Sequence, residues 1–492
     1  MKKKVISLVC LLAAGVAAMT AANPKTEFRG AWLHTVHQGQ YASQSTEENK
    51  AYLRNQLDLL KNAGVNAVIF QVRPSADAFY PSALEPWSRF LSGEAGVAPS
   101  PEWDPLQFMI DEAHARGMEL HAWLNPYRVT TTAKQTLPKN HIYHKHPERF
   151  VTYDKKLYFD PGLPENREFI NDVVRDIVTR YDVDAIHMDD YFYPYPVAGL
   201  DFPDDASYKK YGKGMKLGDW RRKNVDMLIE GLHRTIVESK PWVRFGISPF
   251  GVWRNKSTDP RGSETKALQN YDDLYADVLL WTEKGWVDYM LPQLYWELEH
   301  NRASYIELVK WWEKQSNGRH MYIGQDVVKA MTLPDIAPST EKTQLRHKIE
   351  LARAGKNIHG NCWWPGYSIT KNVNGVADSL SNEFQSTIAL IPAYGWISDE
   401  TPAAPTSLEA KDGRLTWKSA KPTGKVEDTV KFVIYHLPDG DAATAMNDPV
   451  NIVDVVYGNV WNIPSGSQGR YFVTALDRVN NESLPSSTVE IK

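Results

Sequence analysis

The chain has 492 residues, of which 42% are hydrophobic, enough to bury a sizeable core and to form more than one domain. Its formal net charge of −4, without a long run of Lys or Arg, argues against a general nucleic-acid surface. Its 17 Trp and 24 Tyr are natural in a protein that stacks flat rings or sugar faces, although large cores also use such residues.

Residues 1–22 predict a secretory signal peptide. Three lysines precede an apolar run over residues 5–18, and small residues follow up to Ala22, where we expect cleavage. Cleavage removes the three lysines, which takes the charge from −4 to −7. No later stretch offers about 18 uninterrupted apolar residues, so we expect an exported protein, periplasmic or extracellular, without an integral membrane segment.

The positions of the two cysteines decide two further expectations, on lipid anchoring and on disulfide formation. A lipoprotein anchored at Cys10 is disfavoured, because Leu8 and Val9 lack the small residue expected just before a lipidated cysteine. Loss of Cys10 with the leader leaves Cys362 as the only cysteine, which excludes an intramolecular disulfide.

Short apolar runs alternate with amphipathic stretches through most of the chain. Stretches with 3.6-residue apolar spacing predict helices over residues 49–62, 105–116, 166–181, 224–239 and 344–354. Eight apolar runs predict strands within residues 28–36, 66–74, 119–128, 185–194, 243–251, 287–296, 320–328 and 360–368.

This alternation predicts an α/β fold, a (β/α)₈ TIM barrel over residues 26–392. A doubly wound open sheet is the main alternative. It is disfavoured because no Gly-rich phosphate-binding fingerprint follows the first strand.

The sequence changes character after Pro392. Residues 393–400 open a connector rich in Pro, Ala, Ser and Thr, and residues 401–492 show short alternating strands typical of a small β-sandwich. The spacing of "LTW", "FVIY", "YFVTALD" and "NESLPS" resembles a fibronectin type III domain. We interpret this part, which carries no catalytic cluster, as a spacer or accessory module.

Active sites of such barrels lie at the carboxyl ends of the strands, and these ends are strongly polar here. Since alternate residues of a strand face the lumen, period-two spacing selects most of the candidates. The predicted substrate-binding side chains at these ends are His34, Gln71, Arg73, His121, Asn125, Tyr127, Arg128, His187, Tyr191, Gln293, Tyr295, Asp326, Trp363 and Trp364.

Two of these assignments have alternatives. Trp363 and Trp364 point to opposite sides of their strand, so we expect one of the two in the core. Arg73 is equally well explained as a structural salt-bridge partner.

The fourth run, "AIHMDDYFYP", ends in two adjacent acids. By strand parity Asp189 shares the lumen face with His187, whereas Asp190 lies opposite as a supporting or capping residue. A bend at the strand end would instead bring both acids toward the site.

A glycosidase needs one carboxylic acid to protonate the leaving oxygen and a second carboxylate as nucleophile or as base for water. We predict Asp189 as one of them and Glu297, at the end of the sixth run, as the first candidate for its partner, with Asp190 as the third catalytic candidate. The alternative for Glu297 is that it only starts the following helix.

A metal site is not expected. His141, His144 and His146 cluster in "NHIYHKHPERF", but no Cys, HExxH motif or acidic ligand pattern accompanies them. We therefore predict neither a metal nor a cofactor.

Six blocks in order, "FRGAWLHTV", "FQVRPSADAFYPS", "LHAWLNPYR", "IHMDDYFYP", "GISPFGVWRN" and "MLPQLYW", resemble the glycosyl hydrolase-like family 10 over about residues 26–392. The resemblance implies a (β/α)₈ hydrolase of glycan chains, as in bacterial envelope glycosidases that act on peptide-free peptidoglycan strands. The acid motif matches Asp189 and Asp190, and the strand-six motif matches Gln293, Tyr295 and Trp296.

The expected function is thus an exported glycoside hydrolase of a cell-wall or related polysaccharide, with peptide-free peptidoglycan strands as the favoured substrate. One alternative is a non-catalytic glycan-binding envelope protein that uses the same aromatic cleft. Another is a deacetylase or lyase that acts on the same polymer.

Overall fold

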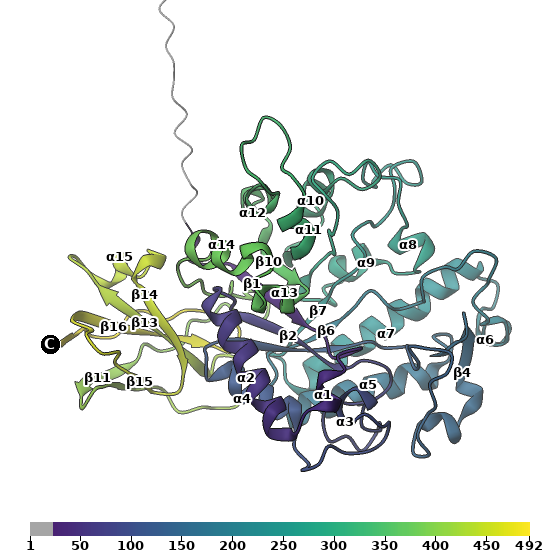
Figure 1. The fold of residues 1–492 in the computed structure, drawn as a ribbon, viewed down its shortest axis with the longest axis horizontal. Coiled ribbons are helices and arrows are strands. Elements are labelled where there is room, and N and C mark those ends of the chain that lie inside the picture. The colour runs from purple at the N-terminus through teal and green to yellow at the C-terminus, as the bar shows by residue number, and fades with distance from the viewer. Residues whose placement is uncertain (1–22) are drawn as a thin grey trace, which may run out of the picture.

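The computed structural model describes residues 23–492, which form a barrel and a smaller β-sandwich (Figure 1). The predicted leader, residues 1–22, lies outside the described residues. Within residues 23–492, no helix combines the length and the apolar character needed to cross a membrane.

Eight parallel strands close into a barrel in the order β1-β10-β9-β8-β7-β6-β3-β2, which confirms the predicted fold class. Each strand falls within or overlaps one of the eight predicted runs. The strands are β1 (Phe28–Leu33), β2 (Ala67–Arg73), β3 (Glu119–Leu124), β6 (Ala185–Met188), β7 (Arg244–Ile247), β8 (Tyr289–Met290), β9 (His320–Asp326) and β10 (Ile358–Trp364).

Helices surround the barrel and bury the outer face of its strands. Because the lumen is also packed, every residue of β1, β2 and β3 is buried, which explains why these strands are near-continuous apolar runs. The longer helices are α2 (Thr46–Asn62), α4 (Pro105–His114), α5 (Pro164–Arg180), α7 (Leu217–Ser239), α10 (Tyr305–Glu313) and α12 (Leu345–Ala354).

Short elements occupy the loops between strands and helices. They are α1 (Gln40–Ser43), α3 (Arg89–Ser92), the hairpin β4 (Phe150–Tyr153) and β5 (Lys156–Phe159), α6 (Asp205–Tyr211), α8 (Asn270–Asp273), α9 (Val278–Glu283), α11 (Val327–Thr332), α13 (Gly366–Thr370) and α14 (Val376–Ser379).

The C-terminal part consists of two antiparallel sheets around their own core, in which Trp417, Phe432, Trp461 and Tyr471 pack together. The likeness of its sequence to a fibronectin type III domain stays a prediction. One sheet joins β11 (Thr406–Lys411), β12 (Arg414–Lys418) and β15 (Val460–Asn462), and the other joins β14 (Ile452–Tyr457), β13 (Thr429–Leu437), β16 (Gly469–Asp477) and β17 (Val489–Ile491), with α15 (Ala442–Ala445) beside them.

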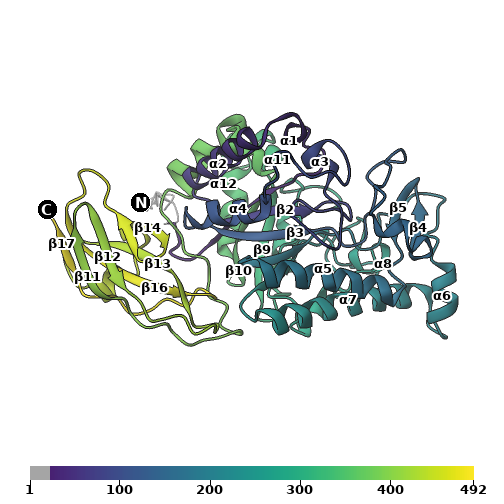
Figure 2. The same ribbon diagram turned by 90° about the horizontal axis from the view of Figure 1, so that it is seen from below.

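The β-sandwich lies against the amino-terminal ends of the barrel strands (Figure 2). Glu119, which begins β3, accepts hydrogen bonds from Lys431 Nζ at 3.0 Å and Asn480 Nδ2 at 3.1 Å, both in the sandwich, and pairs with Arg244 of β7. Gly117 shows how close the two parts approach, since a Cβ there would lie 2.1 Å from the Val455 carbonyl oxygen. The carboxyl ends of the strands, at the opposite end of the barrel, remain open.

Candidate active site

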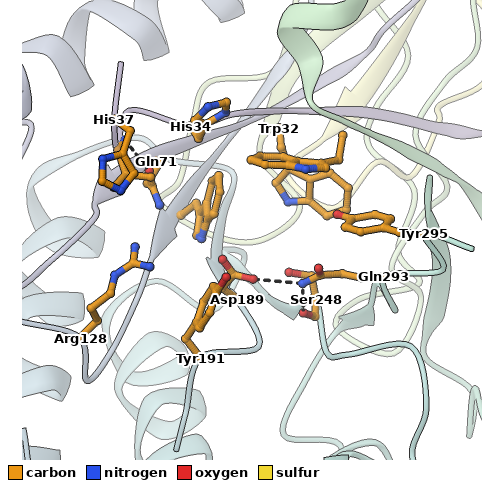
Figure 3. A pocket seen from close by; sticks show the side chains of 13 residues that line it. Trp32, His34, His37, Gln71, Arg128, Asp189, Tyr191, Ser248, Gln293 and Tyr295 are labelled. Carbon is orange, nitrogen blue, oxygen red and sulfur yellow. Dashed lines mark hydrogen bonds between the residues drawn. The ribbon is translucent and has the colours of Figure 1, made fainter. Parts of the chain in front are cut away.

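A cavity of about 570 Å³ opens at the carboxyl ends of the barrel strands (Figure 3). Its volume lies within the range of small-molecule and cofactor sites. It is lined by Trp32, His34, Val36, His37, Gln71, Trp123, Arg128, Asp189, Tyr191, Ser248, Gln293, Tyr295 and Trp364, which follow or end every barrel strand except β9.

Asp189 is the one acidic side chain among these lining residues. Its Oδ1 accepts hydrogen bonds from Gln293 Nε2 at 3.0 Å and from the Asp190 N–H at 2.9 Å. Gln293 Nε2 also donates to the Ser248 carbonyl oxygen at 2.9 Å, which fixes the amide group (Figure 3). Burial raises the pKa of Asp189 despite these donors, so its carboxyl keeps a proton to higher pH than an exposed aspartate does.

Asp190 follows Asp189 just after β6 ends at Met188. Asp189 and Tyr191 line the cavity, whereas Asp190 is buried outside the lining, which is the arrangement expected from strand parity. The Tyr195 hydroxyl donates to Asp190 Oδ2, and Oδ1 has no partner among residues 23–492. Burial and the adjacent Asp189 carboxylate hold the pKa of Asp190 well above its ordinary value.

Aromatic rings form the floor and one wall of the cavity. Trp32 meets Tyr295 and Trp364 edge to face, with ring centroids 6.4 Å and 6.5 Å apart. Trp123 meets Trp364 in the same way at 6.1 Å. The Trp123 indole nitrogen is buried and has no hydrogen-bond partner within the described part of the chain. The cavity thus offers apolar ring surfaces.

The opposite side of the cavity is polar. Figure 3 shows Arg128 and His37 on the side away from Gln293 and Tyr295. Arg128 donates through Nε and Nη2 to the Pro74 carbonyl oxygen, and its guanidinium lies 5.2 Å from the ring centre of Tyr191, which is 37% exposed. A fixed cation therefore lies beside an exposed aromatic ring at the rim.

Two further predicted residues reach the cavity from β1 and β2. Gln71 Oε1 accepts hydrogen bonds from the N–H groups of Thr35 and Val36 at 3.0 and 2.9 Å, which holds the loop after β1 in place. Burial lowers the pKa of His34 to about 4, so its ring is neutral at pH 7.

Several predicted residues lie away from the cavity. A bulge in β2 shifts the register between Gln71 and Arg73. Arg73 is fully buried, forms a salt bridge with Glu85 at 2.6 Å and donates to the Asn125 and Pro126 carbonyls, as the structural alternative requires. Asn125, Tyr127 and Trp363 are also buried outside the cavity lining, and Trp363 is the core member of the Trp363–Trp364 pair.

Of the site residues predicted from the sixth strand onward, some line the cavity and others do not. β8 contains only Tyr289 and Met290. Of the side chains that follow it at period-two spacing, Gln293 and Tyr295 line the cavity, whereas Glu297, in the loop beyond them, does not. Trp296 packs on Phe250 with ring centroids 5.3 Å apart. Asp326 caps α11 by accepting a hydrogen bond from the Lys329 N–H at 3.0 Å. The structure therefore does not bring Glu297 together with Asp189.

His187 and His121 lie below the cavity in a chain of hydrogen bonds along the lumen. Trp32 Nε1 donates to His187 Nε2 at 3.2 Å, and His187 Nδ1 lies 3.0 Å from the Tyr289 hydroxyl. This hydroxyl lies 2.9 Å from His121 Nδ1, whose Nε2 lies 3.1 Å from Glu119 Oε2. Burial holds the pKa of His187 well below its ordinary value, so the ring is neutral.

The donor and the acceptor of each hydrogen bond in this network follow from the chemistry of its groups. An indole N–H can only donate, so His187 Nε2 is an acceptor and Nδ1 carries the proton. Tyr289 then accepts from His187 and donates to His121, which donates through Nε2 to Glu119. The pKa of Glu119 is held well below its ordinary value by Arg244 and Lys431 against the effect of burial, so this carboxylate stays ionised and only accepts.

Five lining residues were not among the predicted site residues: Trp32, Val36, His37, Trp123 and Ser248. The sequence contains a pattern that could have identified most of these residues. Trp32 and Val36 share the period-two register of His34, and Trp123 shares that of His121. His37 and Ser248 stand at strand ends.

Metal-binding side chains do not gather in this structure. Across residues 23–492, no three His, Cys, Asp or Glu side chains lie together in a way that could hold a metal ion. His141 instead caps a short 3₁₀ turn, accepting a hydrogen bond from the Tyr143 N–H at 3.1 Å.

Comparison with known proteins places the chain in a family. The family model described as "Glycosyl hydrolase-like 10" matches residues 27–337. The glycosyl hydrolase YngK of Bacillus subtilis (strain 168) is 40% identical over 484 residues, which are 95% of this chain and 94% of YngK. The glycosyl hydrolase DigH of Escherichia coli (strain K12) is 39% identical over 359 residues, which are 68% of this chain and 81% of DigH.

Among solved structures, the glycoside hydrolase domain of PgaB (BpsB) from Bordetella bronchiseptica matches 73% of this chain and 99% of its own, with 13% identity and a TM-score of 0.46. That likeness is too distant to add to the family assignment. The family match over most of the barrel and the 40% identity along almost the whole chain show that this protein belongs to the glycosyl hydrolase-like family 10 and is a glycoside hydrolase.

Proposed function

We propose that this glycoside hydrolase is exported and cuts the glycan strands of peptidoglycan from which the stem peptides have been removed. The observation that carries the proposal is Asp189, a buried carboxyl with a raised pKa at the floor of a cavity walled by aromatic rings. Such rings suit the apolar faces of sugars, and a protonated carboxyl suits the departure of a sugar oxygen.

Asp189 acts as the general acid. A catalytic acid is most effective when its pKa lies near the working pH, and burial moves an aspartate in that direction. Gln293 and the Asp190 backbone N–H fix the orientation of its carboxyl.

Arg128 supports the preference for peptide-free strands. Removal of the peptide turns the lactyl amide of N-acetylmuramic acid into a free carboxylate. Arg128 is fixed by Pro74 through Nε and Nη2, and its Nη1 has no partner among residues 23–492. A guanidinium with free donors at the rim is well suited to such a carboxylate.

The proposal is tested by incubating the purified mature protein with peptide-free peptidoglycan strands and measuring new reducing ends. Asp189→Asn should lower their release by about 100- to 10,000-fold, because the acid is lost. Asp326→Asn is the matched control, since Asp326 stands at a strand end but outside the cavity lining, and it should retain full activity. Circular dichroism of both variants checks folding.

Three results would overturn the proposal. Full activity of Asp189→Asn would show that Asp189 does not take part in catalysis. Binding of glycans without release of reducing ends would support the glycan-binding alternative. Mass spectrometry that finds products lighter by an acetyl group or by water would identify a deacetylase or a lyase.

Arg128→Gln separates the substrate preference from catalysis. We expect KM for peptide-free peptidoglycan strands to rise about tenfold, because a charge-assisted hydrogen bond is lost. KM for chitin oligosaccharides, which carry no lactyl carboxylate, should stay the same. Arg175→Gln, at an exposed position on α5, is the control for the loss of one positive charge. Equal effects of Arg128→Gln on both substrates would contradict the proposed role.

Export is tested separately. Expression of the full-length chain should yield a mature protein whose N-terminal residue is Asn23, found in the periplasm or the medium. Recovery of the protein inside the cell with its complete leader would contradict the proposed export.

A further inference from the structure

A row of aromatic rings continues from the cavity along the rim of the barrel. Tyr191, Tyr195, Phe250 and Trp296 follow one another with ring centroids 5.8, 6.1 and 5.3 Å apart, and we call these four residues the aromatic row. The row begins inside the site described above, because Tyr191 lines the cavity (Figure 3). At its other end, Trp296 directly follows Tyr295, a second lining residue.

The four rings come from the loops after β6, β7 and β8, which are neighbouring strands of the barrel. The same loops supply Asp189 and Gln293 to the cavity. Phe250 pairs with Gln293 in an isolated parallel β-bridge, which joins two of the loops. The aromatic row therefore borders the cavity on the side that carries the acid.

Both ends of the aromatic row are held in place by the protein. The guanidinium of Arg128 lies 5.2 Å from the ring centre of Tyr191. Lys348, on α12, donates from Nζ to the Trp296 carbonyl oxygen at 2.6 Å. A Cβ at Gly251 would lie 2.5 Å from the Trp296 ring, so this ring packs directly on the backbone. Rings that are fixed before a ligand arrives lose little conformational entropy when it binds.

All four rings remain partly open to solvent. Tyr191 is 37% exposed, and Tyr195, Phe250 and Trp296 are partly exposed. A continuous aromatic surface that stays exposed beside an active site indicates a ligand that covers it. The apolar faces of sugar rings suit such a surface, and its continuity with the cavity identifies the ligand as more of the same glycan chain.

We propose that the aromatic row is an outer binding site for sugars of the glycan chain that lie beyond the sugar held in the cavity. This inference rests on the proposed function and adds a preference for long strands over short oligosaccharides. The outer sugars contribute binding free energy without reacting, so the loss of a ring from the row should act mainly on KM.

Trp296→Ala removes the ring at the end of the row farthest along the chain of contacts from Tyr191. We expect KM for long peptide-free strands to rise about tenfold, because the aromatic contact with an outer sugar is lost. For the shortest peptide-free oligosaccharide that the wild type cuts, KM should rise much less, since few of its sugars reach the row. An equal rise of KM for long and short substrates would overturn the inference.

Two further variants control for a loss of folding. Trp286→Ala removes a tryptophan that is also partly exposed but precedes β8, at the end of the barrel away from the cavity, and it should leave KM for long strands unchanged. Trp296→Phe keeps an aromatic ring and should recover most of the lost affinity. The same KM for Trp296→Ala and Trp286→Ala would contradict an outer binding site.

Binding to the Asp189→Asn variant gives a readout that needs no turnover. Addition of Trp296→Ala to this variant should raise Kd for long strands about tenfold, as measured by isothermal titration calorimetry. An unchanged Kd would overturn the outer site and leave the proposed function intact. Strands that the wild type binds but does not cut would overturn the proposed function alone, whereas strands that it neither binds nor cuts would overturn both.

Discussion

Asp189 depends on the residues around it for its chemistry. Gln293 links two strand ends, since its amide donates both to Asp189 Oδ1 and to the Ser248 carbonyl oxygen. This hydrogen bond favours the ionised carboxylate and lowers the pKa of Asp189, in opposition to burial. The amide is therefore one of the groups that lower the pKa of Asp189 against the effect of burial.

The Gln293→Leu substitution tests this balance. Loss of the donor raises the pKa of Asp189, so the protonated acid persists to higher pH. We expect the alkaline limb of the kcat/KM profile to move upward in pH, whatever the loss in absolute rate. Gln325→Leu is the control, because Gln325 is buried and bonds Tyr305 and Asn361 away from the cavity. An unchanged or downward-shifted limb would contradict the assignment of Asp189 as the acid.

At the scale of the elements, the hydrogen-bonded chain in the lumen joins four strands. Trp32 comes from β1, His187 from β6, Tyr289 from β8, and His121 and Glu119 from β3. Tyr289 is the central link, since its hydroxyl both accepts and donates. This series of hydrogen bonds therefore connects the cavity floor with the opposite end of the barrel.

Tyr289→Phe should destabilise the protein by about 2 kcal/mol or more, because it leaves an N–H of His187 and a ring nitrogen of His121 buried without partners. Urea denaturation followed by tryptophan fluorescence measures the change in the free energy of unfolding. Tyr471→Phe, in the core of the sandwich, is the control and should cost less. A smaller loss of unfolding free energy for Tyr289→Phe than for Tyr471→Phe would show that the hydrogen bonds in the lumen contribute little to stability.

The eight strands could be predicted from sequence because burial on both faces makes each of them a visible apolar run. The placement of single side chains could be predicted only where the strand stays regular. Period-two spacing predicts Asp189 and Tyr191 after β6 and Gln293 and Tyr295 after β8, but it fails at the bulge of β2 and no longer holds at Glu297. These irregularities arise from tertiary packing, so the burial of Arg73 and the separation of Glu297 from Asp189 were not visible in the sequence.

At the scale of the whole molecule, the β-sandwich closes the end of the barrel that lies away from the cavity (Figure 2). The contact is ionic at its centre, where Glu119 meets Arg244 and Lys431, all of them buried. Val479 and Tyr394 add apolar contacts to the same end of the lumen. The sandwich has its own core and packs on the barrel through buried ionic and apolar contacts.

Lys431→Met should lower the free energy of unfolding by about 2 kcal/mol, since Glu119 loses one buried cation but keeps Arg244. Differential scanning calorimetry measures the shift of the thermal transition. Lys425→Met, at an exposed position of the sandwich, should change the stability by less than about 0.5 kcal/mol. Identical transitions for the wild type and Lys431→Met would show that the ionic contact does not couple the two parts.

The hydrogen-bonded network in the lumen reaches the cavity through two different groups. The Trp32 indole N–H can only donate to His187 Nε2, whereas the Ser248 hydroxyl, which lies 3.0 Å from the same nitrogen and lines the cavity, can both donate and accept. The Trp32 link therefore cannot pass a proton in either direction. Any exchange of protons between the cavity and the buried side chains beneath its floor has to pass through the Ser248 hydroxyl.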